Sequence, residues 1–141
     1  MGFIIKKTAA TDIVKAKVTL TSANLLTPNY IVSIPEYTGV TGYYWNVLYM
    51  WGIIRPINIP PILYLGTSQI HIQAIGSTNF QYKFINTFMQ NIVGTSIAAT
   101  INTITGQVYR IDRGLEIHNP GILTLGDTEL DIYIGANLIQ A

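Results

Sequence analysis

Cysteine is absent from the 141-residue sequence, and charged side chains are scarce. Without cysteine the chain can form no disulfide framework, no zinc knuckle and no thiol nucleophile. Charged residues make up 11% of the sequence, against about 25% in an ordinary soluble domain. The polar surface must therefore come mainly from threonine, asparagine, serine and glutamine. Because these groups cost less to desolvate than lysine or glutamate, the composition favours a surface covered by another subunit, with a monomer of bland polar surface as the alternative.

Clustered basic charge is also missing. The formal net charge is +1, and among the eight lysines and arginines only Lys6 and Lys7 are adjacent. Binding to phosphates is driven by groups of such side chains, so we expect no nucleic-acid partner.

Long apolar runs and targeting signals are lacking as well. The longest candidate for a membrane span begins at Tyr43 and stops at Arg55, which is shorter than the ~20 residues that a spanning helix needs. At the N-terminus, the charges of MGFIIKK follow a short apolar run, the reverse of a secretory signal, and Lys6 replaces the serine or threonine of a myristoylation motif. We expect no membrane partner, and a strand over residues 3–8.

What the sequence does contain is period-two alternation, the pattern of β-strands. It is clearest near the C-terminus, where Leu130, Ile132 and Ile134 lead one face, continued by Ala136 and Leu138. Isoleucine and threonine are abundant and suit a pleated surface. Glycine, proline, asparagine and aspartate separate the segments. The predicted strands cover residues 3–8, 13–20, 30–34, 43–54, 62–65, 69–75, 80–84, 97–104, 107–112, 115–118 and 129–138.

Helix signals are few. Residues 21–26 fit one capped turn that stops before Pro28, and residues 86–93 place Phe88 and Ile92 four apart, with Gly94 as a C-cap. Many short strands joined by turns, with no linker and no repeat, predict an all-β fold: an antiparallel two-sheet β-sandwich, jelly-roll-like, forming a single domain over residues 1–141.

One aromatic segment must be buried, either in the core or in an interface. GYYWNVLYMWGIIRPINIPPILYLG, residues 42–66, contains both tryptophans and four of the nine tyrosines. With strict alternation, residues 43, 45, 47, 49, 51 and 53 share one face, and neither face carries a charge. Core packing and a subunit interface are both open for these aromatics, because an exposed strand of this kind would aggregate. The candidate interface residues are Tyr43, Tyr44, Trp45, Tyr49 and Trp51.

No catalytic motif is recognisable. His71 and His118 lie on separate predicted strands and lack zinc-ligand spacing, so each is interpreted as solvent-facing or hydrogen-bonded. Asp127, Glu129 and Asp131 alternate along a strand; they could bind calcium or form a solvated face, but the calcium-loop pattern is absent. We expect no catalytic residues, no metal and no cofactor, and interpret the chain as not an enzyme. A hydrolase with paired carboxylates is the most distant option.

Two segments carry a family resemblance. The segment VTLTSANLLTPNYIVSIPEYTG, residues 18–39, and the segment NPGILTLGDTELDIYI, residues 119–134, resemble small β-rich proteins encoded among the structural genes of tailed bacteriophages. In that group a strand ends in a Leu-Thr-Ser-Ala-type turn, a second strand and a Pro-x-x-x-Gly loop follow, and a Gly-Asp-Thr-x-Leu hairpin closes the domain. The matching residues are turn and core positions, so they bear on the fold and carry no activity.

The resemblance implies a virion component of the capsid decoration or head-fibre type. Its expected partners are copies of itself, in a homo-oligomer for which a trimer is one option, and other virion proteins such as the major capsid protein. The expected location is the virion, assembled in the host cytoplasm. The alternative hypothesis is a glycan- or receptor-binding module of a phage tail or adhesion device, in which tyrosine and tryptophan rings would stack on sugars.

Overall fold

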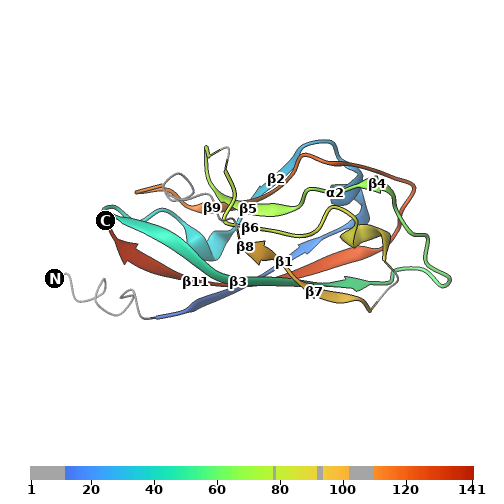
Figure 1. Cartoon of the computed structure of the whole chain (residues 1–141), viewed down its shortest axis with the longest axis horizontal. Coiled ribbons are helices and arrows are strands. Elements are labelled where there is room, and N and C mark those ends of the chain that lie inside the picture. The colour runs from blue at the N-terminus through green and yellow to red at the C-terminus, as the bar shows by residue number, and fades with distance from the viewer. Residues whose placement is uncertain (1–11, 78, 92–93, 102–109) are drawn as a thin grey trace.

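The structure is a computed structural model that describes residues 12–77, 79–91, 94–101 and 110–141, and most of its elements are β-strands (Figure 1). The strands are β1 (Val14–Leu20), β2 (Tyr30–Ser33), β3 (Tyr43–Arg55), β4 (Leu65–Thr67), β5 (His71–Ala74), β6 (Tyr82–Lys83), β7 (Ser96–Ala98), β8 (Thr100–Ile101), β9 (Leu115–Asn119), β10 (Ile122–Thr124) and β11 (Glu129–Gln140). The helical elements of the described residues are α2 (Ser22–Leu26) and the 3-10 turns η1 (Pro35–Tyr37) and η2 (Phe88–Gln90).

The strands form two main antiparallel sheets. Sheet A has the order β1-β11-β3-β7, sheet B has the order β2-β9-β5-β6-β8, and β10 pairs with β4 separately. Figure 1 shows the two layers, with β3 and β11 below and β5 and β9 above. If the short strands β4, β8 and β10 are left out and the remaining strands are renumbered from 1 to 8 in chain order, sheet A has the order 1-8-3-6 and sheet B has the order 2-7-4-5. This is the connectivity of a jelly roll, so the predicted fold class is confirmed.

The core lies between the sheets and follows the alternation of their strands. On β11 the predicted inward face is confirmed, because Leu130, Ile132 and Ile134 are almost completely buried, and Ala136 and Leu138 continue the same row. Sheet B supplies its own inward residues to the same cluster, among them Ile72 and Ile117. Burying each such side chain contributes about 1.5 to 3 kcal/mol, which is why the alternation determines how the two sheets face each other.

Strand β3 contains a β-bulge that the alternation pattern did not reveal. Its partner strand pairs Gly135 with Tyr49 and the next residue, Ala136, with Val47, so Leu48 is left without a partner on β11. An extra residue of this kind shifts the following side chains to the other face of the strand. The single face predicted for residues 43–53 is therefore wrong beyond the bulge.

The bulge divides the aromatic residues of β3 between two environments. Before it, Trp45 and Val47 are buried in the core; after it, the buried residues are Met50, Gly52 and Ile54. Tyr49, Trp51 and Ile53 consequently lie on the outer face of sheet A, where they are half-buried.

A glutamine side chain supplies the hydrogen bonds that strand β3 lacks near the bulge. Gln81, which is 3% exposed, accepts a bond from the backbone N–H of Val47 at 2.8 Å and donates to the backbone carbonyl of Trp45 at 3.0 Å. The hydroxyl of Tyr82 donates to the carbonyl of Leu48 at 2.8 Å. Because buried backbone groups need partners, these two side chains take the place of a neighbouring strand.

The predicted strand over residues 97–104 is divided between the two sheets. Ser96–Ala98 forms β7 in sheet A and Thr100–Ile101 forms β8 in sheet B, while residues 102–104 lie outside the described residues. Between them the N–H of Ala99 donates to the carbonyl of Met50 at 2.8 Å. The chain therefore crosses from one sheet to the other within a single β-rich segment.

The two helix predictions had different outcomes. The first is confirmed as α2, where the Thr21 side chain accepts from the N–H of Asn24 and the Asn24 side chain accepts from the N–H of Thr21, a capping box. The second is wrong as an α-helix over its described residues, 86–91, where only residues 88–90 form the 3-10 turn η2, and residues 92–93 lie outside the described residues. Apolar residues four apart do not make a helix when the segment is too short to nucleate one.

Three predicted strands need correction or lie outside the structure. Residues 62–64 are not a strand: the N–H of Ile62 donates to the Asp127 carboxylate at 2.7 Å, and β4 begins only at Leu65. Residues 110–112 are not a strand: residues 111–112 form a turn, in which Asp112 has a φ of 67° and accepts from the N–H of Gly42. Residues 3–8 and 107–109 lie outside the described residues.

Candidate functional site

The structure separates the five candidate interface residues. Trp45 is a core residue, 5% exposed, and its ring N–H donates to the carbonyl of Thr38 at 2.8 Å. Tyr43 is partly buried against the same core. Tyr44, Tyr49 and Trp51 lie on the outer face of sheet A, and they are the candidates that a partner could reach.

The outer face of sheet A carries a compact aromatic group. The rings of Trp51 and Tyr133, paired across β3 and β11, are stacked with centroids 4.3 Å apart. The ammonium of Lys17 lies 5.6 Å from the Tyr133 ring centroid. Tyr49 covers Gly135, where a Cβ atom would lie only 2.2 Å from the Tyr49 ring. The absence of a side chain at Gly135 therefore leaves the space that the Tyr49 ring occupies.

An ion-pair cluster stands at the end of this aromatic group. The guanidinium of Arg55 donates to Asp131 at 3.0 Å and to Glu129 at 2.7 Å, and the hydroxyl of Thr19 donates to Asp131 at 2.8 Å. Burial of the Asp131 carboxylate opposes its ionisation, but the hydrogen bonds from Arg55 and Thr19 outweigh it, and the pKa of Asp131 falls below its ordinary value. The ionised carboxylate is therefore part of the native structure at neutral pH.

Replacing Asp131 by asparagine tests this cluster through its pH dependence. A carboxylate whose pKa is lowered by folding stabilises the protein above its unfolded pKa, and the contribution disappears as the pH falls through the folded pKa. At pH 7 we expect Asp131→Asn to lower the free energy of unfolding by about 1.5 to 3 kcal/mol, the range for hydrogen bonds to charged groups. Urea denaturation at pH 7 and pH 3 should show this difference shrinking at pH 3. The exposed Asp12→Asn change is the control, and an equal loss at both pH values would contradict the assignment.

The acidic residues considered for calcium are engaged by protein donors. Asp127 lies in the loop before β11 and accepts bonds from the Asn58 side chain at 2.9 Å and from the N–H of Ile62 at 2.7 Å. These two bonds lower its pKa. Glu129 and Asp131 bind Arg55. Within the described ranges no group of three or more potential ligands is positioned to hold a metal ion.

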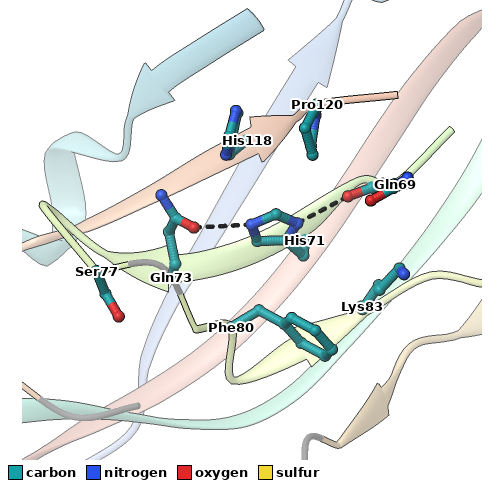
Figure 2. A pocket seen from close by; sticks show the side chains of 8 residues that line it. All are labelled: Gln69, His71, Gln73, Ser77, Phe80, Lys83, His118 and Pro120. Atoms are coloured by element: carbon teal, nitrogen blue, oxygen red, sulfur yellow. Dashed lines mark hydrogen bonds between the residues drawn. The ribbon is translucent and has the colours of Figure 1, made fainter. Parts of the chain in front are cut away.

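A cavity of about 330 Å³ opens on sheet B, the sheet opposite the aromatic group (Figure 2). This sheet B cavity is lined by side chains from β5, β6, β9 and the turns beside them. The lining residues are Gln69, His71, Gln73, Ser77, Phe80, Lys83, His118 and Pro120. None of these residues is acidic, so the cavity gathers basic groups without a carboxylate on its wall.

His71 lies at the centre of the cavity with both ring nitrogens engaged. Its Nδ1 is 2.7 Å from the carbonyl oxygen of Gln69, and its Nε2 is 2.7 Å from Oε1 of Gln73 (Figure 2). The orientation of the Gln73 amide is set on its other side, where Nε2 donates to the Glu116 carboxylate at 2.7 Å. Both nitrogens of His71 thus face oxygen atoms, one of a backbone carbonyl and one of the Gln73 amide.

His118 faces His71 from the neighbouring strand. The two residues are register partners on β9 and β5, and their ring centroids are 5.2 Å apart. Burial lowers the pKa of His118, and the neighbouring His71 lowers it further, while Glu116 acts in the opposite direction. Lys83 adds a cationic group to the cavity wall from β6, beside the Phe80 ring.

The sequence did not predict that His71 and His118 are neighbours. Each histidine was expected to be solvent-facing or hydrogen-bonded, and for His71 the hydrogen bonds are present. Their pairing depends on the register of β5 and β9, which are 40 residues apart in the chain and are joined only by the fold. The alternation in QIHIQAI did place His71 and Gln73 on one face, which is the signal that could have suggested a polar site there.

None of the helices in the described residues has the length and apolar character needed to span a membrane.

The jelly-roll fold has a counterpart among solved virus structures. The chain is similar to a chain of the cyanophage Pam1 capsid asymmetric unit, with a TM-score of 0.52, 14% sequence identity, and coverage of 91% of this chain and 84% of that chain. A chain of turnip yellow mosaic virus aligns over 92% of this chain and 94% of that chain at 8% identity, but with a TM-score of 0.35, which does not establish a common fold. No protein-family model and no curated protein sequence matches the chain. The likeness to the cyanophage chain is one of fold.

Proposed function

We propose that this protein is a non-enzymatic structural subunit of a bacteriophage particle, associated with the capsid in the manner of a decoration or head-fibre protein. The observation that carries the proposal is the outer face of sheet A. There Tyr44, Tyr49 and Trp51 from β3, together with Tyr133 from β11, form an aromatic surface that the described residues leave half-exposed. Interfaces between subunits are enriched in aromatic residues at their centres.

A second copy of this chain is the partner that this surface fits best. Charges of both signs stand around the aromatic group: Lys17 on β1 is exposed, while Glu129 lies in the Arg55 cluster. Lys17 lies 4.0 Å from Asp131, and Glu129 is bonded to Arg55, so these charges are already paired within the chain. A symmetric contact brings the same patch of two subunits together, and a patch with internally paired charges can be covered by a second copy without leaving a charge unpaired. The fold likeness to a chain of a cyanophage capsid supports assembly with further virion proteins, the major capsid protein among them.

The oligomeric state tests this proposal. Size-exclusion chromatography with light scattering should give the full chain a mass that is a multiple of 15.6 kDa. Replacing Trp51 by lysine puts a charge in the centre of the surface and should shift the mass to that of the monomer, because an unpaired charge in an interface is costly to desolvate.

The matched control is Ile31→Lys, an equally drastic change at a residue 50% exposed on β2 of sheet B. It should leave the mass of the assembly unchanged. A native chain that stays at 15.6 kDa at every concentration and does not co-purify with phage particles would contradict the proposal.

The alternative hypothesis, a glycan- or receptor-binding module that stacks sugars on its tryptophans, gains little from this face. Trp45 is enclosed in the core, and one face of the Trp51 ring is occupied by Tyr133. Only the second face of Trp51 is left for a sugar. The outer face of sheet A therefore favours association between proteins.

A further inference from the structure

We propose that the sheet B cavity binds an acidic monosaccharide unit, a uronic acid, with its carboxylate held by Lys83. This binding activity goes beyond the structural role proposed above and lies on the opposite sheet, so either can hold without the other. The volume of about 330 Å³ is at the lower end of the range of small-ligand pockets. It is larger than an inorganic ion requires and comparable to a single sugar ring.

The charge of the wall selects an anion. The cationic side chain of Lys83 lines the cavity together with the imidazoles of His71 and His118, and no acidic residue lines it. Both nitrogens of the His71 ring already contact Gln69 and Gln73, so this ring forms the floor of the site and does not bind the ligand directly. The nearest carboxylate, Glu116, is buried and bonded to the amide of Gln73.

Lys83 is the cationic group on the cavity wall that can meet a carboxylate. It stands on β6 and is the register partner of His71 on β5, while His118 faces His71 from β9 on the other side. Figure 2 shows His118 and Lys83 on opposite sides of the His71 ring. Charge-assisted hydrogen bonds from an ammonium group to a carboxylate are about twice as strong as neutral ones.

The remaining lining residues favour a sugar over a simple carboxylic acid. Phe80 and Pro120 offer apolar surfaces on which the C–H face of a sugar ring can lie. Gln69 is exposed at the rim, and its amide can donate to and accept from hydroxyl groups. The rim is held in place by Asn119, which is 1% exposed and accepts bonds from the N–H groups of Gln69 and Gly121 at 3.0 and 3.1 Å. An apolar platform, an amide and a cationic end match a polyhydroxylated ring that carries one carboxylate.

Calorimetric titration of the full chain with glucuronate, glucose and acetate tests the proposal. We expect saturable binding of glucuronate at least tenfold tighter than that of either glucose or acetate, because glucose lacks the charge and acetate lacks the ring. Lys83→Met should reduce the affinity for glucuronate at least tenfold, and Lys83→Arg should restore most of it.

Lys15→Met removes an exposed lysine of β1, on the other sheet, and is the matched control for the general charge of the protein. It should leave glucuronate binding unchanged. Equal affinities for glucuronate and glucose, an acetate affinity equal to that for glucuronate, or equal losses in the Lys15 and Lys83 variants would each overturn the proposal. The melting temperature of each variant shows that the chain is still folded.

Discussion

Replacing Gln81 by methionine is expected to lower the free energy of unfolding by about 2 to 5 kcal/mol. Methionine keeps the volume of the side chain but cannot accept from the N–H of Val47 or donate to the carbonyl of Trp45. Each of these backbone groups is buried beside the bulge, and an unsatisfied buried group costs about 1 to 3 kcal/mol. Urea denaturation followed by circular dichroism measures the loss directly.

The same substitution at an exposed glutamine separates the hydrogen bonds from the change of residue type. Gln140 ends β11 and is exposed, so Gln140→Met should alter the free energy of unfolding by less than about 0.5 kcal/mol. If the two methionine variants were equally stable, the bulge would not depend on Gln81. The side chain would then be an ordinary buried residue, without the role of a substitute strand.

Replacing Trp45 by alanine is expected to cost about 3 to 5 kcal/mol, the range for removing a large aromatic side chain from a core. Trp45 is buried, its ring lies 5.0 Å from that of Tyr37, and its N–H is bonded to Thr38. Trp51→Ala, six residues further along the same strand, should cost only about 0.5 to 1.5 kcal/mol, mainly from the lost stacking on Tyr133.

The comparison of the two tryptophans must be made at one protein concentration, because an interface residue also changes stability through assembly. Chemical denaturation of both variants below the concentration at which the chain associates gives the intrinsic difference. Equal losses for Trp45→Ala and Trp51→Ala would mean that the bulge at Leu48 does not divide the strand as the register indicates. A larger loss for Trp51 would place it in the core instead.

The candidate interface shows how much of strand β3 the alternation of side chains can predict. Alternation predicted β3 as a strand and identified its aromatics as a feature that needs a cover, and both ends of the strand lie within a residue of the prediction. It could not distinguish Trp45 from Trp51, because the two are an even number of residues apart and an unbroken strand puts them on one face. The extra residue at Leu48 reverses that result. The local sequence of an apolar run does not indicate the position of a β-bulge.

The sheet B cavity illustrates a second limit. Each of its strands is short, and the polar residues His71, Lys83 and His118 are separate features in the sequence. They become neighbours because β9 and β6 both pair with β5 in a defined register. Pairing of strands distant in the chain is a long-range choice, made by the whole set of inward-facing side chains at once.

By itself the sequence determined that this protein is an all-β chain without thiol chemistry, with few charges and with apolar strand faces that must be buried. Those properties follow from composition and from a side-chain period of two, which are local. The tertiary structure decided that Trp45 is a core residue and Trp51 a surface residue, and that Glu129 and Asp131 bind Arg55. It also decided that two histidines and a lysine line one cavity. These outcomes depend on strand order, register and a single inserted residue, and only the packing of two sheets against each other sets all three.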